Sequence, residues 1–168
     1  PWRHRLWSLI EVTPYLDWML LTKRADCIGR LLPAAWLKSP RPNVWLGTTA
    51  ENQRRAEERI PALLEVPAVV HWISAEPLLG AVDFTQWLPG YKFPVTDDAT
   101  DAPDGASVGG LVRIGNTWNR RKGINWVIVG GESGADARRM APEWATDILR
   151  QCRSAGIAYH FKQKGRLL

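Results

Sequence analysis

Short apolar runs recur along this chain of 168 residues; after each run the sequence turns polar, and after three of them it takes on helical spacing. Continuous apolar runs are typical of strands buried on both faces, and strands that alternate with helices pair in parallel through right-handed crossovers. The pattern predicts an α/β fold: a partial parallel (β/α) barrel of about four to five strands in a single domain over residues 1–168, with an open parallel sheet as the alternative. The runs lie at 16–22, 44–49, 68–73, 124–129 and 157–161.

Three segments between these runs have the spacing of amphipathic helices. Residues 25–32 follow the first run, and residues 51–65 follow the second with one apolar stripe, although Pro61 is expected to kink or restart that helix. A third helix is predicted to begin near Pro142, because proline and an acid suit a first turn, and to end at Gly156. Each predicted helix therefore crosses from one strand to the next.

The stretch at about 85–122 interrupts this alternation. It holds several glycines, prolines and aspartates, and then the basic residues Arg120, Arg121 and Lys122. A connection of this length inside a domain is usually a functional insertion or a disordered segment. We predict an irregular insertion here, with residues 96–110 disordered on composition.

The formal charge of the chain is +5, with basic residues in excess at both ends and acidic residues in excess over 61–110. This balance permits contact with nucleic acid through its phosphates, although many basic proteins never bind it. No run reaches the roughly 20 apolar residues of a membrane span, and no signal peptide opens the chain, so we expect a cytoplasmic protein without membrane contact. Cys27 and Cys152 have no metal-ligand spacing and are interpreted as buried thiols, so no metal site is predicted.

The polar clusters that end the runs are the candidate functional residues. In parallel α/β folds the carboxyl ends of the strands share one edge, and ligands bind there. Carboxylates, basic groups and hydroxyls gathered at one edge suit a zwitterionic or phosphorylated ligand, whereas the plainer alternative is that polarity resumes wherever a strand ends. The clusters comprise Thr22, Lys23 and Arg24; Thr48, Thr49, Glu51 and Asn52; Ser74 and Glu76; Glu132 and Ser133; and Lys162, Gln163 and Lys164.

The glycine pair after the fourth run is the most specific local feature. Gly130 and Gly131 would let a ligand approach the backbone and use its amides as donors, although an ordinary tight turn is the simpler interpretation. The spacing matches neither a dinucleotide fingerprint nor a phosphate-binding loop. Glu76 precedes Pro77, so its carboxylate is expected to project towards the same edge from a stiff backbone. No catalytic residue is predicted.

Five motifs, in this order, resemble a bacterial and phage protein family of unknown function that is related to radical S-adenosylmethionine enzymes. They are LTKR at 21–24, NVWLG at 43–47, SAEPLLG at 74–80, VGGESG at 129–134 and FKQ at 161–163. The resemblance implies a (β/α) barrel with an iron–sulfur cluster and S-adenosylmethionine at the carboxyl ends of its strands. It also implies cofactor contacts from Thr48, Ser74, Glu76, Gly130, Gly131, Glu132 and Ser133, and substrate contacts from Lys23, Arg24, Glu51, Asn52, Lys162 and Gln163.

The cysteines depart from that family. Its members carry three closely spaced cysteines that hold a [4Fe–4S] cluster, whereas this chain begins at Pro1 and has two cysteines that match no such motif. We therefore expect the C-terminal part of a radical S-adenosylmethionine-like protein, inactive alone, whose intact parent uses the cluster and S-adenosylmethionine on an unknown substrate. The alternative is a cluster-free module that binds nucleic acid along the strand ends and the 120–122 loop, and an inactive remnant is a third possibility.

Overall fold

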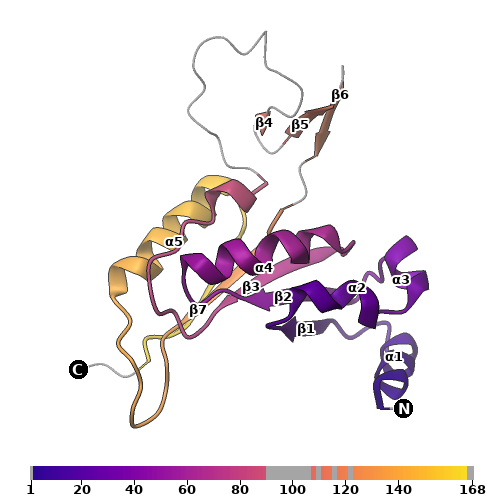
Figure 1. The fold of residues 1–168 in the computed structure, drawn as a ribbon, viewed down its shortest axis with the longest axis horizontal. Coiled ribbons are helices and arrows are strands. Elements are labelled where there is room, and N and C mark those ends of the chain that lie inside the picture. The colour runs from indigo at the N-terminus through magenta and orange to yellow at the C-terminus, as the bar shows by residue number, and fades with distance from the viewer. Residues whose placement is uncertain (1, 90–106, 109–110, 115–116, 121–122, 166–168) are drawn as a thin grey trace.

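The computed structural model describes residues 2–89, 107–108, 111–114, 117–120 and 123–165. Its centre is a five-stranded sheet in the order β1-β2-β3-β7-β8, with every neighbouring pair parallel (Figure 1). The predicted α/β fold and its parallel strands are confirmed, and the described strands form an open sheet whose edges are β1 and β8. The strands are β1 (Trp18–Thr22), β2 (Val44–Thr49), β3 (Val70–Ala75), β7 (Trp126–Gly130) and β8 (Ala158–Gln163).

Two long helices cover one face of this sheet. Helix α4 (Gln53–Glu65) follows β2, and helix α5 (Pro142–Ala155) follows β7 (Figure 1). The core between helices and sheet includes Ile60 of α4 and Ile148 of α5 together with the strand residue Ile73, all three inaccessible to solvent. Because side chains alternate along a strand, every second residue points instead to the opposite face, which α4 and α5 do not cover.

The ends of α4 and α5 follow from their sequences. The side chain of Asn52 accepts a hydrogen bond from the backbone of Arg55 and so caps α4. Helix α4 continues through Pro61, so the predicted restart there is wrong: proline removes one backbone bond, but the buried residues on either side hold the helix against the sheet. The predicted bounds of α5 are confirmed, with Pro142 at its start and Gly156 in the left-handed conformation (φ +66°) after its end.

The region before β2 contains more helix than the apolar pattern indicates. The single helix predicted at 25–32 forms as a 3₁₀ turn, η1 (Ala25–Cys27), followed by the short helix α2 (Ile28–Leu31). Helices α1 (Trp2–Val12) and α3 (Ala34–Lys38) were not predicted. These two helices contact each other through an edge-to-face pair of indoles, Trp7 and Trp36, at 5.2 Å.

The 85–122 segment is not wholly irregular, and that prediction is wrong where strands form. A 3₁₀ turn, η2 (Thr85–Trp87), opens it, and three short strands form a separate antiparallel sheet: β4 (Ser107–Val108), β5 (Leu111–Ile114) and β6 (Thr117–Arg120). The predicted disorder at 96–110 lies outside the described residues apart from β4. Arg121 and Lys122 also lie outside them.

The two ends of the segment meet next to the amino end of β7. The backbone amide of Ile124 donates to the carbonyl of Trp87 at 2.9 Å, and a Cβ on Gly123 would lie 2.6 Å from that same carbonyl oxygen. The base of the insertion therefore lies at the edge opposite the carboxyl ends of the strands. Within the described residues, none of the helices combines the length and apolar character that crossing a membrane requires.

Candidate functional site

The parallel register brings the predicted polar clusters to one edge of the sheet. Thr22 pairs with Thr48, Thr49 with Ser74, and Gly130 with Gln163, so the five strand ends form a continuous row. Parallel strands share their carboxyl edge by geometry, which is why the clusters gather although they are far apart in sequence. Within this row the side chains form separate groups of contacts, described below.

The first group joins β3 to β8 across β7. The ammonium nitrogen of Lys162 lies 3.5 Å from Oε1 of Glu76, and the hydroxyl of Ser74 donates to Oε2 of Glu76 at 3.4 Å. Gly130 of β7 lies beneath this carboxylate, because a Cβ at that position would collide with Oε1 of Glu76. The side chain of Glu76 is 18% exposed and that of Lys162 is 57% exposed. This group is therefore an accessible pair of opposite charges.

The second glycine allows two backbone segments to meet. The amide of Gly131 donates to the carbonyl of Gln163 at 2.9 Å, and the side-chain amide of Gln163 donates to the carbonyl of Gly131 at 3.1 Å. A Cβ on Gly131 would collide with the carbonyl of Lys164. The close approach that the glycine pair predicted thus occurs inside the chain, where it fixes the end of β8 against the loop after β7.

A second group of charges lies at the end of β2 and is nearly buried. Arg59 of α4 donates to Oε2 of Glu51 at 2.8 Å and to the hydroxyl of Thr49 at 2.7 Å. Lys23 approaches the other carboxylate oxygen of Glu51 at 3.3 Å. Burial acts to raise the pKa of Glu51, but backbone and Lys23 hydrogen bonds and the charges of Arg59 and Lys23 outweigh it, so the pKa lies below its ordinary value.

Arg59 was not among the predicted site residues. Arg59 was missed because α4 contains many charged residues, among which one more arginine does not stand out. Its spacing from Ala56 and Leu63, however, places it close to the apolar stripe of the helix. An arginine on such a stripe is a signal that sequence analysis can use, because a buried guanidinium requires several acceptors. Here Thr49 and Glu51 supply them.

A third group lies in the exposed loop after β7. Arg138 donates twice through its guanidinium to Glu132, at 2.7 and 2.8 Å, and once through its backbone amide at 2.8 Å. These hydrogen bonds, the side-chain bond first, lower the pKa of Glu132 to about 2. The pKa of Arg138 is raised, chiefly by the same bond and in smaller part by the charge of Glu51. The loop and the β2 end are thus electrostatic neighbours.

Most of the other predicted residues use their hydrogen-bonding groups for contacts within the chain. Thr48 is inaccessible to solvent, and its hydroxyl donates to the carbonyl of Thr22 at 2.7 Å, joining the ends of β1 and β2. The side-chain oxygen of Asn52 caps α4. Arg24 donates its backbone amide to the hydroxyl of Thr22, and Ser133 lies exposed in the loop after β7. The edge therefore contains fewer groups open to a ligand than the sequence predicted.

Three indoles lie on the face of the sheet that carries Glu76. Side chains alternate between the two faces of a sheet, so Trp72, which lies four residues before Glu76, points to the same face. Trp126 pairs with Trp72 in register and therefore lies on that face as well. The ring centroids of Trp45 and Trp126 are 6.1 Å apart, and those of Trp72 and Trp126 are 6.2 Å apart. Trp72 covers Gly47, where a Cβ would collide with the indole. We call Trp45, Trp72 and Trp126 the tryptophan cluster.

The cysteines offer no metal site. Cys27 is 7% exposed and Cys152 is inaccessible, and burial raises the pKa of the Cys152 thiol to about 12. Within the part of the chain that the structure describes, no group of three or more histidine, cysteine, aspartate or glutamate side chains could hold a metal ion.

An open parallel sheet with polar and charged groups along its carboxyl edge defines the class: an α/β protein whose candidate site lies at the strand ends. The chain belongs to the family described as "Protein of unknown function (DUF5131)", which matches residues 1–168. The predicted family of unknown function is thereby confirmed, and its relation to radical S-adenosylmethionine enzymes stays a prediction. No curated protein and no solved structure matches the chain.

Proposed function

We propose that this chain binds S-adenosylmethionine, or a ligand with the same zwitterionic amino-acid group, at the carboxyl edge of a sheet that forms part of a radical S-adenosylmethionine-like barrel. The observation that carries the proposal is the Glu76–Lys162 pair, in which opposite charges lie 3.5 Å apart. A ligand with an ammonium and a carboxylate group is complementary to that arrangement. The resemblance of the five motifs supplies the candidate ligand.

The exposure of the pair favours exchange with a ligand. An ion pair with one partner more than half exposed contributes only about 0–1 kcal/mol to stability, so separating it costs little. Two charge-assisted hydrogen bonds to a ligand contribute about 1.5–3 kcal/mol each. Two such bonds to a zwitterion therefore outweigh the internal pair that they replace, and this difference offsets part of the cost of immobilising the ligand. Ser74 remains as a donor to Glu76 on the side away from Lys162.

The tryptophan cluster supports a ligand that carries a base. Trp45 and Trp126 are partly exposed on the same face as Glu76, and Trp126 lies about 13 Å along β7 from Gly130, which lies under the charged pair, so a ligand that contacts both must be elongated. Stacking of a base on an aromatic side chain contributes about 1–3 kcal/mol. An adenosylated amino acid combines the two groups that this face would bind, which a plain amino acid does not.

The residues of this chain fit S-adenosylmethionine but do not fit an iron–sulfur cluster. A [4Fe–4S] cluster is held by cysteine thiolates, and the sequence offers two cysteines, one at each end of the chain and both buried. The role proposed for this chain is therefore binding and orientation. Any cluster belongs to the intact parent that the resemblance implies.

Calorimetric titration of S-adenosylmethionine into the chain tests the proposal. We expect saturable binding that weakens about tenfold in Glu76→Gln and in Lys162→Met, because each removes one charge-assisted hydrogen bond. Lys38→Met is the matched control: it removes an exposed lysine of α3, before β2 and away from the carboxyl edge. Adenosine, which lacks the zwitterion, should bind wild type and Lys162→Met alike. Failure of the wild-type chain to bind, or equal affinity in all variants, would overturn the proposal.

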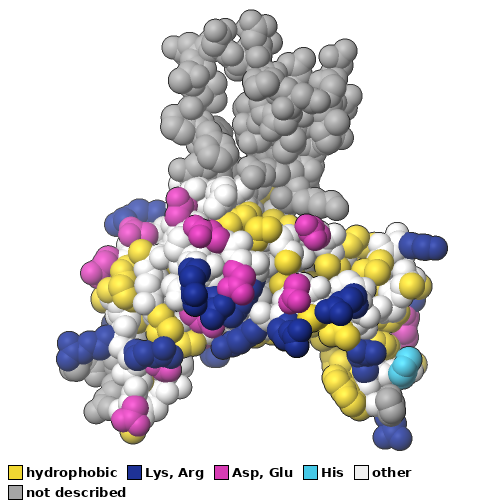
Figure 2. Space-filling view, viewed as in Figure 1, with side chains coloured by type: hydrophobic (Ala, Val, Ile, Leu, Met, Phe, Trp, Pro, Cys, Tyr) yellow, Lys and Arg dark blue, Asp and Glu magenta, His cyan; other side chains and the backbone are white. Residues whose placement is uncertain are grey.

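Nucleic-acid binding is the alternative function, and the contacts at the edge favour it less. Lys23, Arg138 and Lys162 each lie beside a carboxylate of this chain, so phosphates would compete with internal partners. Figure 2 shows acidic and basic side chains interspersed over the face that carries α4, rather than one basic patch. Affinity for DNA or RNA that falls steeply with salt would favour this alternative over a small zwitterion.

A further inference from the structure

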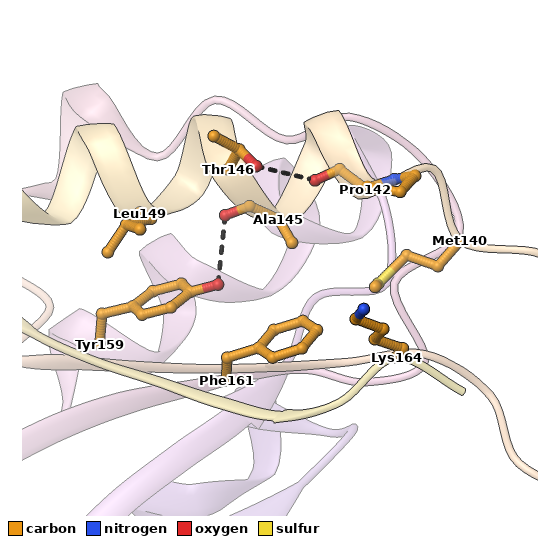
Figure 3. Close-up of a pocket in the computed structure, with 8 residues that line it drawn as sticks. All are labelled: Met140, Pro142, Ala145, Thr146, Leu149, Tyr159, Phe161 and Lys164. Atoms are coloured by element: carbon orange, nitrogen blue, oxygen red, sulfur yellow. Dashed lines mark hydrogen bonds between the residues drawn. The ribbon is translucent and has the colours of Figure 1, made fainter. Parts of the chain in front are cut away.

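A concave site, apart from the Glu76–Lys162 pair, lies between α5 and the edge strand β8, on the helix-covered side of the sheet. It is a cavity of about 390 Å³, within the range typical of small-molecule sites. Figure 3 shows it lined from above by the first half of α5 and from below by β8. The lining residues are Met140, Pro142, Ala145, Thr146, Leu149, Tyr159, Phe161 and Lys164.

The interior of this cavity has few free hydrogen-bonding groups for a polar ligand. The hydroxyl of Tyr159 donates to the carbonyl of Ala145 at 3.2 Å, and the hydroxyl of Thr146 donates to the carbonyl of Pro142 at 3.1 Å (Figure 3). These lining hydroxyls thus already have acceptors within α5. Met140 and Phe161 add soft and aromatic apolar surface, and Phe161 is 39% exposed. Such a cavity binds an apolar group in preference to water.

One charged group lies at the cavity. The ammonium of Lys164 lies near Met140 and Phe161 in Figure 3, and among the described residues no hydrogen bond or ion pair engages it. Neighbouring Lys162, by contrast, lies beside Glu76 on the other face. An apolar cavity with a single unpaired cation at its side is complementary to a molecule with an apolar body and one anionic group.

We propose that this cavity binds an amphipathic carboxylate, with its apolar body between α5 and β8 and its carboxylate at Lys164. The site is separate from the Glu76–Lys162 pair, which lies on the opposite face of the sheet. Its ligand is separate too, since the cavity pairs a single positive charge with apolar walls, whereas Glu76–Lys162 suits a zwitterion.

The two methionines of the chain provide an internal comparison for the test. Met140 lines the cavity, and Met19 lies on β1, at the far edge of the sheet. We would label the methionine methyl groups with ¹³C, titrate the chain with decanoate and, separately, with decan-1-ol, and follow both signals by NMR. We expect the Met140 signal to shift saturably and the Met19 signal to stay. Decanoate should bind about three- to fivefold more tightly than the alcohol, because a partly exposed ion pair contributes modestly.

Three variants test the roles of Lys164 and of the cavity separately. Lys164→Met should bring decanoate down to the affinity of the alcohol, and Thr146→Phe, which fills the cavity from an exposed helix position, should abolish binding of both. Arg153→Met removes one positive charge near the other end of α5 and should change neither. The proposal is overturned if both methionine signals move together, if neither moves, or if Lys164→Met leaves the preference for decanoate unchanged.

Discussion

Two ion pairs at the carboxyl edge use the same chemistry in different surroundings. The side chains of Glu51 and Arg59 are 11% and 10% exposed, and they hold α4 against the end of β2. The side chains of Glu132 and Arg138 are 27% and 60% exposed, and their contact lies within the loop after β7. A buried charge that loses its partner keeps its full desolvation penalty, whereas an exposed one regains water. Burial, not pairing, therefore decides which of these pairs stabilises the fold.

Arg59→Met should have the largest effect on stability. It removes the guanidinium that satisfies both Glu51 and Thr49 and leaves the carboxylate nearly buried with only Lys23 beside it. Breaking a buried pair in this way costs about 3 kcal/mol of unfolding free energy. Urea unfolding followed by tryptophan fluorescence measures this loss.

The control for that variant lies one turn earlier on α4. Arg55 pairs with Glu58 at the surface, where the two side chains are 34% and 56% exposed. Arg55→Met removes the same group from the same helix and should cost about 0.3–0.5 kcal/mol. Equal losses in the two variants would show that Arg59 acts only through helix propensity, and the contrast between buried and exposed pairs would fail.

Glu51→Gln should have the next largest effect, and one that depends on pH. The pKa of Glu51 is lower in the folded chain than in the unfolded one, so its ionised form contributes stability above the unfolded pKa of about 4.3, and this contribution is lost as the pH falls through the folded value. The variant should therefore be less stable than wild type by roughly 2 kcal/mol at pH 7. The difference in unfolding free energy between wild type and variant should become smaller below about pH 4. A gap that is constant from pH 7 to pH 3 would contradict the role given to the charge.

The sequence predicts the central sheet well because each strand is a continuous apolar run. All five runs form strands of the parallel sheet, and α5 begins and ends where Pro142 and Gly156 indicate. Helix α1 was not predicted because its apolar residues are spread around the helix instead of forming one stripe: Ile10 is buried, whereas Trp2 and Val12 are exposed. The short strands β4 to β6 were not predicted because glycines interrupt the apolar pattern around them.

The sequence also predicts which edge carries the polar groups, but not how they pair. Glu76 and Lys162 meet because β7 lies between β3 and β8 and has glycine at position 130, which depends on strand order. Glu51 meets Arg59 because α4 folds back over the end of β2. Contacts of this kind depend on tertiary packing, whereas the shared edge follows from parallel pairing alone.

The loop pair provides the smallest stability effect and completes the comparison. Arg138→Met should lower the urea midpoint at pH 7 by much less than Arg59→Met does, because Glu132 regains water when its partner is removed. The same variant should nevertheless raise the pKa of Glu132 from about 2 towards the ordinary range, since the hydrogen bonds to the Arg138 side chain that lower it are gone. Carboxyl ¹³C NMR of the folded chain measures that pKa, with the exposed Glu143 of α5 as the reference signal.

A raised pKa together with a midpoint that falls much less than in Arg59→Met would establish that the exposed loop pair contributes less to the fold than the buried pair does. A midpoint that falls as far as in Arg59→Met would mean instead that the loop after β7 unfolds together with the sheet. In that case exposure would be a poor guide to which charges at this edge a ligand can displace, and Lys162, which is about as exposed as Arg138, would exchange its partner for a ligand less readily than proposed.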